Sequence, residues 1–138
     1  MLRRMDAAGA LADLTEISSQ VERAAIVGAD GAVLGSTFDD EERAKRFVEG
    51  AQRLVEAAET VREARGLSGL GQLEAATVGG SVFVVRDGER LIAATTKPEP
   101  TVGLVFYDLK HCLRSVEEAP KPKPRRRAAT KKEPDAPS

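Results

Sequence analysis

The pattern of apolar and polar positions changes period several times along this chain, and its longest regular stretch runs from Asp39 to Arg65. Apolar side chains recur there at steps of three and four residues, which is the spacing of an amphipathic helix. One stripe has the arrangement of a helix lying on a sheet and consists of Ala44, Val48, Ala51, Val55 and Ala58. The sequence therefore predicts a long helix packed against a sheet.

A second apolar stripe, here named the seam, lies beside the first on the same helix. It has the seven-residue repeat of helix-on-helix packing and consists of Phe47, Gly50, Leu54, Ala57, Val61 and Ala64. The two stripes together cover roughly 200° of the helix, about twice the arc that one sheet face requires. A glycine inside an exposed helix costs about 1 kcal/mol relative to alanine, so Gly50 indicates that another backbone passes close by. We expect a second helix against the seam.

Both ends of the long helix have recognisable signals. Asp39 is a suitable N-cap residue, and Glu42 follows three positions later as in a capping box. Gly66 follows the last turn in the position of a C′ glycine.

The remaining chain up to residue 118 predicts two shorter helices and five strands. One helix is expected from about Asp6 to Gln20 and another from Val102 to Val116, because apolar residues there share one helical face. Strands are expected over residues 23–29, 32–37, 72–78, 81–86 and 89–96. Hairpin turns are expected at Asp30-Gly31, Gly79-Gly80 and Asp87-Gly88.

The run Val82-Phe-Val-Val85 is apolar at consecutive positions, which is typical of a central strand covered on both faces. Helices should therefore lie on both sides of the sheet. The predicted fold class is α/β, an α-ββ-α-βββ-α sandwich whose five-stranded sheet is mostly antiparallel.

The strand predicted from residue 72 to residue 78 offers an unprotected edge. It has one charge and neither proline nor lysine to discourage pairing with another strand. We expect this edge to join an interface through Gln72, Glu74, Ala76 and Val78.

Charge divides the 138 residues into two parts. Residues 1–118 hold 14 Lys and Arg against 20 Asp and Glu, whereas residues 119–138 hold 7 against 2. The first part is expected to form one domain. The second is rich in Pro, Lys, Arg and Ala, has no large apolar residue, and is expected to be a disordered basic tail. Its candidate electrostatic contacts are Lys121, Lys123, Arg125, Arg126, Arg127, Lys131 and Lys132.

Cysteine use and hydropathy indicate the compartment. Cys112 is the only cysteine, so no internal disulfide can form, and this fits a reducing compartment, by default the cytoplasm. The longest run without charge, residues 75–85, is shorter than the ~18 residues that a membrane span needs.

No pattern of catalytic, metal-binding or cofactor-binding residues emerges. Gly66, Gly69 and Gly71 follow a helix and lack the Lys-Ser/Thr ending of a phosphate-binding loop. The acidic residues 39–42 fit the first turn of a helix and lack calcium-loop spacing. His111 and Cys112 point about 100° apart on a helix and cannot share a metal without further ligands. We expect Cys112 in the core, His111 in solvent, and no enzymatic activity.

An ordered set of motifs resembles a known family. Leu11-x-x-Leu14, Val21-x-x-Ala24-x-Ile26-Val27 and Asp30-Gly31-x-Val33-Leu34-x-Ser36 precede the long helix, and Gly103-Leu-Val follows the hairpins. Residues 9–117 thereby resemble the Roadblock/dynein light chain family. The resemblance implies a profilin-like scaffold that dimerises, in which the long helices of two subunits pack together and the third strands join edge to edge.

The resemblance also implies a function. Members often bind or regulate small Ras-like GTPases, and some accelerate GTP hydrolysis without supplying a catalytic residue. The first hypothesis is therefore a homodimeric, non-enzymatic adaptor or regulator of a small GTPase. A second is a dimerising module whose basic tail binds nucleic acid or an anionic membrane surface. A third, small-molecule sensing in a cleft, has no convergent polar cluster in its favour.

Overall fold

The structure, a computed structural model, describes residues 5–63 and 71–116. Three helices and five strands follow one another in the order that the sequence predicts. They are α1 (Ala7–Ile17), β1 (Val21–Val27), β2 (Val33–Ser36), α2 (Glu41–Glu63), β3 (Gln72–Thr77), β4 (Gly80–Asp87), β5 (Arg90–Thr96) and α3 (Val102–Ser115).

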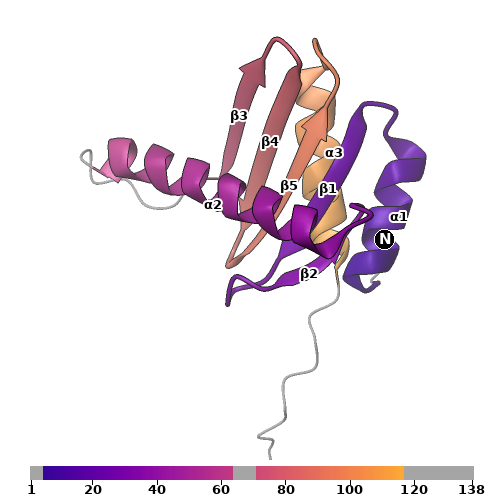
Figure 1. The fold of residues 1–138 in the computed structure, drawn as a ribbon. Helices are drawn as coiled ribbons and strands as arrows, with labels where there is room; N and C mark the ends of the chain where they lie inside the picture. The colour runs from indigo at the N-terminus through magenta and orange to yellow at the C-terminus, as the bar shows by residue number, and fades with distance from the viewer. Residues whose placement is uncertain (1–4, 64–70, 117–138) are drawn as a thin grey trace, which may run out of the picture.

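The five strands form one sheet in the order β2-β1-β5-β4-β3, and every neighbouring pair is antiparallel. The sheet consists of a β1-β2 hairpin and a β3-β4-β5 meander, which are joined where β1 pairs with β5. Helices α1 and α3 cover one face and α2 crosses the other (Figure 1). The predicted sandwich with helices on both faces is confirmed.

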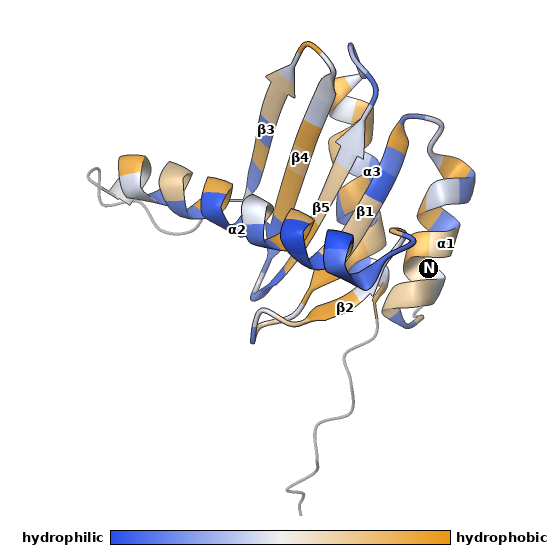
Figure 2. Ribbon diagram, in the orientation of Figure 1, coloured by the Kyte–Doolittle hydropathy of each residue, from blue (hydrophilic) through white to orange (hydrophobic). Residues whose placement is uncertain are grey.

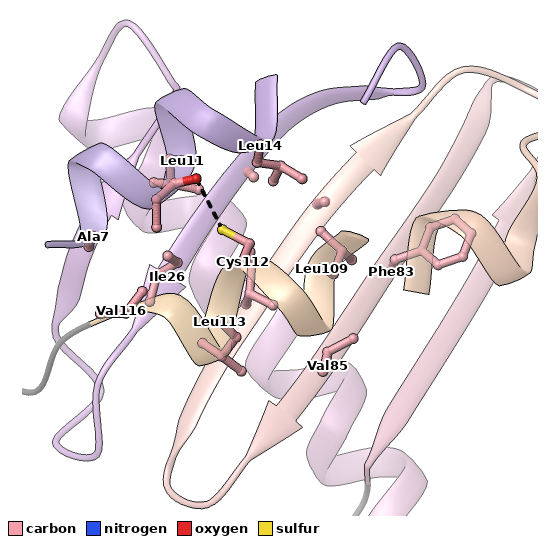
Figure 3. Packing of buried hydrophobic residues seen from close by; sticks show 14 of the residues in the cluster. Ala7, Leu11, Leu14, Ile26, Phe83, Val85, Leu109, Cys112, Leu113 and Val116 are labelled. Atoms are coloured by element: carbon pink, nitrogen blue, oxygen red, sulfur yellow. Dashed lines mark hydrogen bonds between the residues drawn. The ribbon is translucent and has the colours of Figure 1, made fainter. Parts of the chain in front are cut away.

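One hydrophobic core lies between the sheet and the pair α1 and α3 (Figure 3). The rings of Phe83 on β4 and Phe106 on α3 meet edge to face, with centroids 4.9 Å apart. Cys112 is buried in this core, and its thiol donates a hydrogen bond to the carbonyl oxygen of Ala10 over 3.4 Å. The prediction that Cys112 belongs to the core is confirmed.

A second core lies between α2 and the opposite face of the sheet. It is formed by the first predicted stripe of α2, in which Ala44, Val48, Ala51 and Val55 are all buried, together with sheet residues such as Val84 and Ala93. Much of β4 is hydrophobic (Figure 2), and its residues contribute to both cores. The prediction that it is covered on both faces is confirmed. Ala58, the last member of the stripe, is half-buried, and α2 continues beyond the edge strand β3 (Figure 1).

Two of the three predicted hairpin turns are displaced by one residue, and the first is longer than the predicted two residues. Five residues, 28–32, connect β1 and β2 and include the predicted Asp30-Gly31. Gly28 N donates a hydrogen bond to Ala32 O within this connection, and Gly31 takes the positive φ of 84°. The other two turns are Val78-Gly79 and Gly88-Glu89. Gly80 belongs to β4, where a Cβ atom would collide with the carbonyl oxygen of Thr96. The dipeptide signals were right about the existence of all three turns, and two of them were wrong by one residue about the position.

The start of α2 also differs from the prediction by one residue. Asp40, not Asp39, caps the helix: its Oδ1 accepts from Glu42 N at 3.0 Å, and its carbonyl oxygen accepts from Ala44 N at 3.0 Å. Adjacent aspartates are equivalent as cap candidates in the sequence, so only the backbone geometry distinguishes them. The predicted C′ glycine, Gly66, lies outside the described residues.

Within residues 5–63 and 71–116, no helix is both long and apolar enough to cross a membrane.

Candidate interaction surface

The seam on α2 is open in the single chain. Phe47 and Gly50 are half-buried and Ala57 is exposed, while Leu54 is 37% and Val61 72% exposed. A Cβ atom placed on Gly50 would have no neighbouring heavy atom within 4 Å. The described part of the chain therefore leaves the seam open at Gly50, Leu54, Ala57 and Val61. Ala64, its last predicted member, lies outside the described residues.

Apolar surface continues from the seam onto the sheet. Leu73 on β3 and Val82 on β4 are half-buried, and both pack, like Phe47, against the cluster beneath α2. Ala75 pairs with Val82 and is also half-buried. Sequence reasoning missed Leu73 and Ala75. Their alternation with the polar Gln72 and Glu74 was the available signal, since side chains alternate between the two faces of a strand.

The edge of β3 presents unpaired backbone groups. At one end of β3, Gly71 O accepts a hydrogen bond from Arg86 N, and at the other end Thr77 and Gly80 close the two-residue turn. In an antiparallel pair, every second residue forms hydrogen bonds with the neighbouring strand. The odd-numbered residues from 71 to 77 therefore form hydrogen bonds with β4. The even-numbered residues Gln72, Glu74 and Ala76 direct their N–H and C=O groups outward, away from the sheet. These are three of the four strand residues predicted for an interface, and all three side chains are exposed.

The fourth predicted residue, Val78, lies in the turn after β3. The residue is 98% exposed. It therefore extends the apolar surface at one end of the open edge.

Other chemistry considered from the sequence gains no support from the described residues. Over residues 5–63 and 71–116, no three His, Cys, Asp or Glu side chains are grouped as metal ligands. His111 is exposed, as predicted, and stacks on Tyr107 with ring centroids 6.5 Å apart. Burial raises the pKa of the Cys112 thiol to about 12, which makes it a poor nucleophile at neutral pH.

Gly66, Gly69 and the seven tail residues lie outside the described residues, whereas Gly71 is exposed just before β3.

The Roadblock/LC7 domain family model matches residues 8–97. The chain belongs to this family. Its Roadblock/LC7 region thus runs from the second residue of α1 to the residue after β5, and includes the seam and the β3 edge. The sequence has no match among the curated proteins.

Solved structures share the Roadblock/LC7 fold at low sequence identity. A Roadblock/LC7 domain from Streptomyces avermitilis superposes with a TM-score of 0.69 at 17% identity, covering 80% of this chain and 94% of that one. The gliding protein MglB from Thermus thermophilus superposes with a TM-score of 0.66 at 13% identity, covering 79% and 84%. MglB from Myxococcus xanthus superposes with a TM-score of 0.61 at 12% identity, covering 79% of this chain and 80% of that one. At such identities the similarity concerns the fold.

Proposed function

We propose that this Roadblock/LC7 protein is a cytoplasmic, non-enzymatic homodimer that serves as an adaptor or regulator of a small Ras-like GTPase. The observation that carries the dimer is the open seam. Its large side chains Phe47, Leu54 and Val61 are partly or largely exposed along a helix that also has a glycine at the centre of the stripe. Heptad-spaced apolar side chains on one helix are stabilised when a second helix covers them.

The β3 edge supports the same arrangement. Its outward backbone groups can form hydrogen bonds with a second β3, and a strand edge without proline or lysine is usually covered in a native protein. A seam and an edge that lie on one side of the molecule allow helix packing and strand pairing in a single interface. The region from Gln72 to Ala76 would then lie at the centre of a sheet shared by two subunits.

The GTPase part of the proposal has a different basis. It comes from membership of the Roadblock/LC7 family, whose members often bind or regulate small GTPases. The similar solved structures include gliding proteins named MglB. Regulation without enzymatic chemistry fits a surface built from aliphatic side chains and backbone groups.

Sedimentation velocity at micromolar concentration tests the dimer with two matched variants. Gly50→Leu adds a large side chain where the chain itself has free space, so the variant should fold and yet fail to dimerise. Arg53→Leu adds a leucine at an exposed position outside the seam and should dimerise normally. A wild-type monomer, or a Gly50→Leu dimer of unchanged affinity, contradicts the proposal.

The GTPase function is tested separately with small Ras-like GTPases of the host organism. Each is loaded with GDP or with a non-hydrolysable GTP analogue and titrated against the wild-type protein. We expect one of them to bind with an affinity that depends on the nucleotide. Absence of binding in both nucleotide states refutes the GTPase assignment and leaves the dimer intact.

A further inference from the structure

A groove follows the flank of α2 that faces away from the seam. One part, of about 670 Å³, lies between α2 and β2, and a second part, of about 390 Å³, continues towards the β4-β5 turn. Gly31 and Gln52 line both parts, so the two adjoin, and the side-chain amide of Gln52 reaches towards Gly31 at their boundary. Together the two parts are here named the groove. Gln52 and the seam residue Leu54 are two positions apart and therefore point about 200° away from each other. A partner on the seam leaves the groove accessible.

The floor of the groove next to β2 is apolar. Val33 and Leu34 line it and are 39% and 48% exposed, and the buried Val48 of α2 lies at its base. The strand β2 is at the edge of the sheet and pairs only with β1. The groove thus offers exposed aliphatic surface beside an open strand edge, which suits an extended peptide.

The walls of the groove are acidic. Its lining includes five carboxylates and two cationic side chains: Asp39, Glu41, Glu49, Glu56 and Glu89 against Lys45 and Arg86. Arg86 already forms an ion pair with Glu59 of α2. The groove is therefore suited to an extended segment that carries several positive charges.

We propose that residues 119–138 of the same chain occupy this groove. The segment has seven Lys and Arg against two Asp and Glu, a sign opposite to that of the groove. In its stretch from Lys121 to Arg127, Pro122 and Pro124 alternate with lysine. Proline restricts the backbone to extended conformations, so such a segment loses less entropy when it docks.

The position of the last described residue places the segment near the groove. Arg90 Nη1 donates a hydrogen bond of 3.1 Å to Val116 O, and Met5 N donates one of 2.9 Å to Ser115 O. The two chain neighbours of Arg90, Glu89 and Leu91, both line the groove. Val116 itself is buried on the opposite face of the sheet, under α1 and α3, close to the end of the sheet at which the groove finishes. The four residues from 117 to 120 span about 13 Å when extended, so under this proposal they would pass that end of the sheet and bring Lys121 to the groove.

The groove and the cationic run of the segment also have similar lengths. On α2 the groove extends from Glu41 to Glu56, about 22 Å at 1.5 Å per residue. The seven residues from Lys121 to Arg127 span about 19 Å at 3.1 Å per residue of polyproline conformation. The cationic run therefore matches the acidic wall, and it stays docked whether or not a second subunit covers the seam.

Paramagnetic broadening in the full-length protein tests the docking. The variant Ala128→Cys accepts a nitroxide label just beyond the cationic run, while the buried Cys112 stays unlabelled at neutral pH. With the label, the amide signals of Gly31, Ala32 and Gln52 should lose intensity several-fold relative to the reduced label. Added salt should restore them, because screening weakens the attraction.

Two charge-reversal pairs make the test specific. The double variant Glu49→Lys, Glu56→Lys reverses two charges on the groove wall and should abolish the broadening. The control, Glu16→Lys with Glu22→Lys, makes the same charge change at exposed positions of α1 and β1. It should leave the broadening unchanged. Broadening that is spread evenly over the surface, or equal in the two variants, overturns the proposal. Broadening seen only between labelled and unlabelled chains in a mixture overturns the assignment to the same chain.

Discussion

The ring of Phe47 packs against the ring of Phe38, with centroids 5.1 Å apart and planes inclined by 40°. Phe38 lies in the connection between β2 and α2, and Phe47 is the first residue of the seam. Such aromatic pairs contribute about 0.5–1.5 kcal/mol beyond the area that they bury. The first large side chain of the seam is therefore held in place within the single chain, which lowers the entropy cost of ordering it when a partner binds.

A substitution at Val61 should change dimerisation while leaving the folding of the single chain almost unaffected. Because its side chain is 72% exposed, Val61→Glu should change the free energy of unfolding of the single chain by no more than about 0.5 kcal/mol. It should nevertheless weaken dimerisation at least tenfold, because a carboxylate would be buried in the seam. Analytical ultracentrifugation against Thr60→Glu, an exposed neighbour outside the seam, provides the comparison. Equal dimer affinity in the two variants excludes this end of α2 from the interface.

The alternation of backbone groups on β3 predicts opposite effects for proline at neighbouring positions. Ala76→Pro removes an N–H group that points outward, so the fold should persist while dimer affinity falls. Ala75→Pro removes a hydrogen bond to β4 and should destabilise the fold by about 3 kcal/mol or more. Circular dichroism and sedimentation report the two effects separately. A folded Ala76→Pro protein with wild-type dimer affinity would show that the edge is not paired.

Asp108 gives a prediction about pH. Asp108 is only 7% exposed, and burial raises the pKa of its carboxyl group. The nearby His111 partly opposes this rise in pKa. A raised pKa means that Asp108 favours the folded state below its unfolded pKa and that this contribution is lost as pH rises through the folded value. Asp108→Asn should therefore raise the free energy of unfolding at pH 7, because the amide carries no charge to bury.

The advantage of Asp108→Asn should shrink as the pH falls towards 3.8, where the unfolded carboxyl group is itself half protonated. Urea unfolding at several pH values measures it. The exposed Asp13→Asn serves as control. A gain from Asp108→Asn that does not change with pH would assign the effect to packing.

Adjacent glycines in the β3-β4 hairpin should respond differently to alanine. Gly80 has a φ of 145°, and a Cβ atom there would collide with Thr96 O, so Gly80→Ala should destabilise the protein by more than about 2 kcal/mol. Gly79 has free space around it, and Gly79→Ala should change stability by less than about 0.5 kcal/mol. Thermal melts of the two variants compare them directly. Similar melting temperatures would contradict the close contact at Gly80.

The sequence predicted the elements well because the buried side chains of each follow a regular spacing. Val48 and Val55 at helical spacing, and Phe83 with Val85 at strand spacing, all lie in the core. Turn positions were displaced because a glycine dipeptide shows that a positive φ is needed without showing which residue adopts it. The N-cap of α2 was predicted one residue too early, at Asp39 instead of Asp40, because adjacent aspartates look alike in the sequence.

The candidate surfaces were predicted less completely. The seam was visible as a heptad, because all its members lie on one helix. The groove was not, since Leu34, Glu49 and Glu89 come together only in the folded chain. Asp108 was also missed: a charged residue within a helix is usually exposed, and only the packing of α3 shows that this one is buried.

The pairing of β1 with β5 has a consequence for the route of folding. Val27 pairs with Leu91 across most of the domain, whereas the β1-β2 hairpin and the β3-β4-β5 meander close through short turns. Closing a long loop costs more entropy and slows folding, so the two local units should form first and their joining should limit the rate. The β3 edge exists as soon as the meander forms, but the groove needs both units. A nascent chain would thus expose its pairing edge before it has a place for its cationic segment.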